Sequence, residues 1–352
     1  MKKVLPISLK NRLETECWSF FRFAIIEAYD NLKNWKFEKY NKIYADGNGN
    51  VFFGVKGKIY NQLSVYNDIL NIKGFLHKEI KSNKIINFIK QSIQENNYII
   101  LECNYSILGV ENTTEELYIH ELIIFGYDDI KKVFLCPILG KKGWDIEEIP
   151  YIDIEKAYSY LDKIDINKIG QTLLYKREYH YPINLIKVKN GYSYDDNIFL
   201  LYYDILELCN ETKYKYTNNN LKNDVEFYDG YLACIQDLIN AGEKILLNNY
   251  SDKEYFYSTN IRKIIDYREI LYERINYLFK INNITLNNIV LLDKYITNKL
   301  YIAFNLALKY DLNGNGKNID VVVKNLIDFH ENERIVLSKV KEIMEKFILE
   351  NY

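Results

Sequence analysis

The chain has 352 residues and a formal net charge of −2, with 46 lysines and arginines against 48 acidic residues. Hydrophobic residues make up 48% of it, enough to form the core of one large domain or two of ordinary size. The charges are scattered, and no basic stripe is visible. This distribution argues against a nucleic-acid-binding protein, because such proteins neutralise phosphates with clustered lysines and arginines.

The sequence shows no segment that predicts export or membrane insertion. The basic start Met1-Lys2-Lys3 is followed by an apolar run that is too short for a signal peptide. No stretch approaches the roughly 20 uninterrupted apolar residues that a membrane span needs. The five cysteines are an odd number, are widely spaced and contain no CxxC pair, so they indicate free thiols in a reducing compartment. We therefore expect a cytoplasmic protein with no membrane partner.

The first 165 residues predict a mixture of helices and short strands. A helix is expected to begin near Cys17, with an apolar face through Phe21, Ala24, Ile25 and Ala28, and a second to cover 84–95. Short β-favouring runs follow at 99–101, 122–125 and 133–135. The turn residues Gly126-Tyr127-Asp128-Asp129 separate the last two runs and predict a hairpin there.

The second half of the chain predicts helices. One short strand is expected at 183–188, and from about residue 195 onward apolar residues recur at helical spacing. The final segment, 319–349, alternates apolar positions with Glu and Lys, as a solvent-facing helix does. We therefore predict an α+β protein with a domain at 1–165 and a mainly α-helical domain at 166–352.

Cys17 is the first candidate for chemistry. A thiol in the first turn of a helix lies near unsatisfied backbone N–H groups, which favour the thiolate and can stabilise a neighbouring oxyanion. Glu14 and Glu16 act in the opposite sense unless they point to solvent. The alternative is that Cys17 is a small buried residue, as most free cysteines are.

His120 is the candidate base, since it opens the most apolar predicted strand and only four histidines are present. A neutral imidazole near a thiol can accept its proton and later return one to a leaving group. The alternative is a hydrogen-bonded structural histidine. A cysteine on an early helix, followed about a hundred residues later by a histidine on a strand, is the chain order of papain-like enzymes.

Metal sites are not predicted. The segments 46–50 and 311–316 are similar to calcium loops, but Gly57 and Val322 stand where the bidentate glutamate would be. No spacing of histidine and cysteine suggests zinc, and no phosphate-binding glycine motif is present. We interpret both segments as glycine turns.

Two motifs together resemble a known family. Glu16-Cys17-Trp18-Ser19-Phe20-Phe21-Arg22-Phe23 and Ile119-His120-Glu121-Leu122-Ile123-Ile124-Phe125-Gly126 are similar to those of the butirosin biosynthesis protein H family, papain-like and C39-like cysteine acyltransferases. The resemblance extends loosely over most of the chain. It implies a papain-like N-terminal domain at 1–165 with Cys17 as nucleophile and His120 as base.

The resemblance also implies partners. Members of this family transfer an acyl group from the phosphopantetheine thioester of an acyl or peptidyl carrier protein to an amine, in thiotemplated natural-product biosynthesis of antibiotics by nonribosomal routes. The expected partners are therefore a carrier protein and a small-molecule amine, such as a diamine, with no bound cofactor, no metal and no nucleic acid. The alternatives are a cysteine peptidase and a non-catalytic binding protein on a papain fold.

The third catalytic residue departs from the papain-like pattern. An Asn or Asp about sixteen residues after the histidine orients the imidazole in such enzymes, and that position holds Cys136 here. A thiol is a poor hydrogen-bond partner for an imidazole. Either Asp145 supplies the carboxylate or the site works as a dyad. Trp18, Cys103 and Cys136 are kept as candidate substrate-lining residues.

Overall fold

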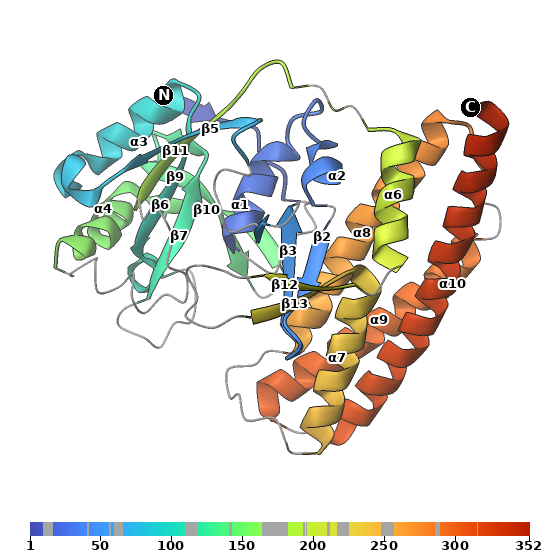
Figure 1. Ribbon diagram of the computed structural model, residues 1–352. Helices are drawn as coiled ribbons and strands as arrows, with labels where there is room; N and C mark the ends of the chain where they lie inside the picture. The colour runs from blue at the N-terminus through green and yellow to red at the C-terminus, as the bar shows by residue number, and fades with distance from the viewer. Residues whose placement is uncertain are drawn as a thin grey trace. The chain divides into compact units, whose positions relative to one another are not determined.

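The computed structural model is an α+β protein with antiparallel sheets and a helical C-terminal region, which confirms the predicted fold class (Figure 1). It describes residues 1–9, 17–40, 42–55, 58–59, 66–109, 118–140, 143–163, 182–192, 194, 196–209, 212–216, 225–247, 257–285, 289–314 and 316–352. Residues 17–19, 54–55, 58–59, 140, 212–216, 225–229 and 289–293 are described by their backbone only. Among the described residues, no helix combines the length and the apolar character needed to cross a membrane.

The chain forms two compact units, and each of them is assembled from two separate segments. Unit 1 comprises Met1–Lys33 and Asn61–Ser193, and unit 2 comprises Asn34–Tyr60 and Tyr194–Tyr352. The predicted boundary at residue 165 lies outside the described residues. Asn34–Tyr60, which the linear division places in the N-terminal domain, belongs to unit 2 because its strands pair there.

Unit 1 contains two four-stranded sheets, in the orders β1-β8-β9-β10 and β5-β11-β6-β7. The strands are β1 (Lys2–Val4), β5 (Leu70–Phe75), β6 (Tyr98–Asn104), β7 (Ile119–Ile124), β8 (Gly126–Asp128), β9 (Val133–Gly140), β10 (Gly143–Pro150) and β11 (Ile183–Val188). The helices are α1 (Cys17–Ile26), α3 (Ile85–Gln94) and α4 (Tyr151–Ser159). Every residue of β6 is buried, as expected of a strand in the centre of a core.

The predicted hairpin is formed by β8 and β9, and not by β7 and β9. Gly126, assigned to a turn from the sequence, instead begins β8, and β8 pairs with β9 in the register Gly126↔Leu135. A side chain at Gly126 would lie 3.1 Å from the carbonyl oxygen of Lys3 and 3.3 Å from the Cα of Val4. The glycine is therefore needed for the close approach of β1. The turn itself contains Lys132 in the left-handed region, with a φ of 58°.

Unit 2 combines a five-stranded sheet, in the order β12-β13-β2-β3-β4, with long helices. The strands are β2 (Lys42–Ala45), β3 (Val51–Val55), β4 (Lys58–Ile59), β12 (Thr212–Tyr216) and β13 (Val225–Asp229). The helices are α2 (Trp35–Lys39), α6 (Ile198–Cys209), α7 (Tyr231–Leu246), α8 (Tyr257–Ile281), α9 (Ile289–Asn313) and α10 (Ile319–Asn351). The sequence pattern did not predict β12 and β13.

The turn between β2 and β3 is fixed from two sides. Asp46 accepts hydrogen bonds from the backbone N–H groups of Asn48 and Asn50, which confirms a turn at 46–50. The buried Asp237 carboxylate, on α7, accepts the N–H of Gly49 at 2.8 Å. On α8, the side chain of Asn260 accepts a hydrogen bond from the N–H of Val51, and Lys263 donates one to the carbonyl oxygen of Val51. Side chains of two helices therefore satisfy backbone groups of this hairpin.

Candidate functional site

The predicted nucleophile heads a helix. Helix α1 begins at Cys17, so the backbone of this residue lies in the first helical turn. The side chains of Cys17 and Trp18 lie outside the described residues. Three residues further on, Phe20 is fully buried and stacks on Trp144 of β10, with ring centroids 3.8 Å apart and an interplanar angle of 9°. This stacking attaches the first turns of α1 to the β9–β10 hairpin.

The predicted base lies on β7 and is oriented by the backbone. The Nδ1 atom of His120 lies 2.8 Å from the carbonyl oxygen of Glu121. A carbonyl oxygen only accepts, so this hydrogen bond requires the proton on Nδ1. In the neutral ring Nε2 is then left with its lone pair available. The half-buried imidazole is also flanked by the rings of Tyr105 and Tyr118, whose centroids lie 5.2 and 5.4 Å from its own.

The predicted orienting carboxylate is placed elsewhere. Asp145 is exposed on β10, and its Oδ1 accepts a hydrogen bond from the N–H of Ile146 at 2.8 Å. It makes no hydrogen bond to His120 within the part of the chain that the structure describes. The carbonyl group of Glu121 supplies the contact to Nδ1 that the sequence analysis sought from Asp145.

Cys103 is the residue directly opposite His120. The register of β6 and β7 pairs Cys103 with His120 and Glu102 with Glu121. Residues that are opposite in an antiparallel ladder share one face of the sheet, and consecutive residues alternate between faces. Cys103 and His120 therefore lie on one face of the ladder, and Glu102 and Glu121 on the other.

The two thiols near this ladder are poor nucleophiles. Burial, together with a smaller contribution from the adjacent Glu102 carboxylate, raises the pKa of Cys103 to about 12. Burial also raises the pKa of Cys136, on β9, well above its ordinary value, and the Cys103 thiol contributes in the same direction. Both residues are fully buried. Since the thiolate is the reactive form, these cysteines are poorly suited to attacking a substrate.

An ion pair that the sequence analysis did not identify connects α1 with β7. The Nη1 atom of Arg22 lies 3.8 Å from Oε2 of Glu121, and both side chains are buried, at 2% and 7% exposure. The Arg22 guanidinium also lies over the ring of Tyr66, 6.0 Å from its centroid. The available signal was a charge inside an apolar run, because both residues stand in otherwise hydrophobic stretches. Glu121 thus faces α1, whereas His120 lies on the other face of the ladder.

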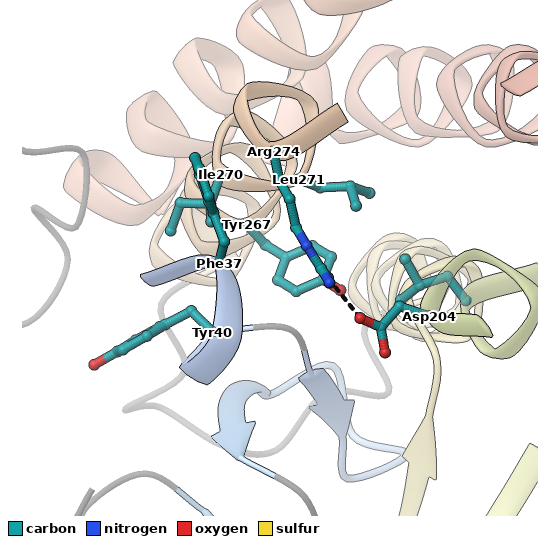
Figure 2. A pocket seen from close by; sticks show the side chains of 8 residues that line it. Phe37, Tyr40, Asp204, Tyr267, Ile270, Leu271 and Arg274 are labelled. Atoms are coloured by element: carbon teal, nitrogen blue, oxygen red, sulfur yellow. Dashed lines mark hydrogen bonds and ion pairs between the residues drawn. The ribbon is translucent and has the colours of Figure 1, made fainter. Parts of the chain in front are cut away.

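A small hollow in unit 2 is not a substrate site. Figure 2 shows it between α2, α6 and α8, where the guanidinium of Arg274 reaches the Asp204 carboxylate. Its remaining lining residues are Phe37, Tyr40, Leu208, Tyr267, Ile270 and Leu271. A volume of about 10 Å³ can hold one water molecule at most. Arg274 is also held by both carboxylate oxygens of Asp196, at 2.6 and 2.8 Å, so the polar groups here form a structural ion pair.

The comparisons with known proteins leave the family open. No protein-family model matches the chain, and no curated protein matches it. Within the described ranges, no group of three or more His, Cys, Asp or Glu side chains is arranged to hold a metal ion.

Proposed function

We propose that this protein is a cysteine-dependent acyltransferase, with Cys17 as nucleophile and His120 as base, which transfers an acyl group from a carrier-protein thioester to an amine. The observation that carries the proposal is the backbone hydrogen bond from His120 Nδ1, because it leaves Nε2 as the proton acceptor. The position of Cys17 at the start of α1 adds support, since helix N-termini favour a thiolate. The raised pKa values of Cys103 and Cys136 make these two the weaker candidates.

The proposed reaction has two steps. His120 takes the thiol proton, and the Cys17 thiolate attacks the thioester carbonyl, so that the carrier's pantetheine thiolate leaves and takes up that proton. An amine then attacks the acyl-cysteine, the Cys17 thiolate leaves, and the proton lost by the amine passes to His120. The exchange of one thioester for another is nearly balanced in free energy, and formation of the amide drives the sequence without ATP. Water must be kept from the acyl-cysteine for the amine to compete.

The ladder geometry favours one rival, a non-catalytic protein on a papain-like fold. Helix α1 is joined through Arg22 to the face that carries Glu121, and His120 lies on the opposite face. The proposal therefore requires the imidazole and the Cys17 thiol to come into contact past the end of β7. His120 is close to that end, as the second residue of the strand. A cysteine peptidase would use the same two residues but would need no carrier.

Intact-protein mass spectrometry tests the proposal. The protein is mixed with an acyl-pantetheine thioester, with and without a small diamine, beside Cys17→Ala and His120→Gln. We expect an acyl adduct on the wild type that the diamine discharges as amide, no adduct on Cys17→Ala, and strongly slowed acylation of His120→Gln. Cys209→Ala is the matched control, because Cys209 is a partly exposed thiol of α6 in the other unit, and it should acylate normally.

Other outcomes would contradict the proposal. An adduct that persists in Cys17→Ala and maps to Cys103 or Cys136 would show that the nucleophile is misassigned. A folded wild type that forms no adduct with any thioester would favour the non-catalytic protein. Cleavage of peptide substrates without amide formation would favour the peptidase.

A further inference from the structure

We infer that Arg22 and Glu121 are positioning residues, which act as one buried ion pair to hold the His120 imidazole in its Nδ1–H form. The inference rests on the proposed function only for its catalytic consequence. The orientation of the His120 imidazole on β7 does not depend on that function.

Glu121 has two roles, one through its main chain and one through its side chain. Its backbone carbonyl accepts the Nδ1 proton of His120 at 2.8 Å, and its carboxylate lies 3.8 Å from the Arg22 guanidinium. The same residue therefore fixes the imidazole through its main chain and is itself fixed to α1 through its side chain. Because the two contacts belong to one residue, a displacement of Glu121 relative to α1 would move the carbonyl group that holds the imidazole.

Two carboxylates face each other on the strands beside His120. Glu102 and Glu121 stand directly opposite each other on one face of the ladder, and both are buried, at 4% and 7% exposure. Directly opposed like charges destabilise a sheet, and a buried carboxylate needs a partner. Arg22 is the cation that the structure places at Glu121. Arg22 brings a positive charge to these facing carboxylates, in a region shielded from water.

The proposed nucleophile and the cation of the ion pair lie on the same helix, α1. Arg22 follows Cys17 by five residues on the same helix. The ion pair therefore connects the helix that begins at the proposed nucleophile with the residue that orients the proposed base. In papain-like enzymes a side-chain Asn or Asp gives the imidazole its orientation. Here the backbone carbonyl of Glu121, a residue held by its own side-chain ion pair, can fulfil the same requirement.

The test uses the full chain labelled with ¹⁵N-histidine. The His120 signals are assigned by their loss in His120→Gln, and the ring nitrogen shifts report which nitrogen carries the proton. We expect one Nδ1–H tautomer in the wild type. In the double variant Arg22→Met/Glu121→Gln we expect a mixture of tautomers, because the strand residue that holds the ring has lost its anchor. Removing both charges of a buried pair is close to neutral for stability, so this variant should stay folded.

Activity gives the second readout. Acylation of Cys17 should slow by roughly 10- to 100-fold in the double variant, as expected from a small misplacement of a catalytic group. Arg22→Lys, which keeps the positive charge, should recover most of the wild-type rate and the single tautomer. The matched control is Arg274→Met/Asp196→Asn/Asp204→Asn, which removes a buried ion-pair cluster of unit 2 and should leave the His120 tautomer unchanged.

The outcomes separate the two proposals. An unchanged His120 tautomer in the folded double variant would overturn the positioning role, whatever the enzyme does. A shifted tautomer together with a wild type that never acylates Cys17 would uphold the positioning of the ring and refute the proposed reaction. A double variant that shifts the tautomer but acylates at the wild-type rate would overturn the catalytic consequence of the pair.

Discussion

Replacing Glu333 by leucine should destabilise the helices of unit 2 strongly, because Arg268 would stay buried without its carboxylate. Arg268 on α8 donates from Nε to both oxygens of Glu333 on α10, at 3.0 and 3.1 Å, and from Nη2 to Oε2 at 3.1 Å. Glu333 is fully buried and Arg268 is 5% exposed. Loss of one partner of such a pair costs about 3–5 kcal/mol. At about 2–4 °C per kcal/mol for units of this size, the melting temperature should fall by roughly 6–20 °C.

The companion variant Arg268→Met/Glu333→Leu separates unpaired charge from lost packing. Replacement of both members of a buried pair by apolar residues is often neutral or stabilising, so the double variant should unfold within about 1 kcal/mol of the wild type. Asp328→Asn on the same helix is the matched control: it breaks a partly exposed pair with Lys299, worth about 1 kcal/mol or less.

The assay is urea unfolding followed by circular dichroism of the helices, with the midpoint and slope fitted together. A cost of less than about 1 kcal/mol for Glu333→Leu, the range of an exposed pair, would refute the role of the buried charge. That role is also refuted if the double variant is as unstable as the single one, because the cost would then come from packing.

The structure makes three further predictions. Gly242→Ala should destabilise the protein by about 1–3 kcal/mol in a denaturant titration, because the new Cβ would lie 2.5 Å from the Tyr257 hydroxyl; Gly316→Ala, with open space around it, is the control. Burial raises the pKa of Asp237 from 3.8 to about 6, so the folded state binds this proton more tightly than the unfolded state does. The stability that the bound proton contributes is therefore lost as the pH rises through 6. Relative to the wild type, Asp237→Asn should therefore gain stability between pH 4 and pH 7, by at most about 3 kcal/mol, as followed by melting curves. Cys103, whose pKa is raised from 9.0 to about 12, should carry roughly 1,000-fold less thiolate at pH 8 than an ordinary thiol, and alkylation of the native protein should be slower by at least that factor.

Each of these has a clear contrary result. Equal effects at Gly242 and Gly316 would show that the neighbours of Gly242 give way to the new Cβ at no cost. A constant difference between Asp237→Asn and the wild type from pH 4 to pH 7 would show that the carboxylate is adequately stabilised. Rapid alkylation of Cys103 in the folded protein would show that its strand opens readily.

Local patterns predicted α1, α3, the mainly helical region after residue 195 and the strands β6, β7, β9 and β11, but they did not predict α2 or α4. The apolar spacing predicted a helix over 84–95, and α3 spans Ile85–Gln94. A strand at 183–188 was predicted, and β11 has those bounds. Where an element depends on a distant partner, the pattern was insufficient. β13 pairs with β2, about 180 residues earlier in the chain, and the pattern of a short segment does not indicate such a distant partner.

The same distinction holds for the site. The sequence could indicate Cys17 and His120, because the helix and strand that carry them are visible locally. It could not join Arg22 to Glu121, since that pairing depends on the packing of α1 on β7. Gly126 is a comparable case: a glycine beside turn-forming residues suggests a turn, and only the neighbouring strand β1 shows that it is needed for close approach.

The interleaved segments of the two units have a consequence for synthesis on the ribosome. The hairpin of β2 and β3 leaves the ribosome about 180 residues before β13, the strand that pairs with it in the register Tyr44↔Asp229. At about 5–20 residues per second, roughly 10–40 s pass before that partner exists. During this interval the hairpin side chains destined for burial, Ile43 and Phe53 among them, have no core to enter. This early segment of the nascent chain is therefore open to aggregation and to chaperone binding long before helices α6 to α10 of unit 2 have been made.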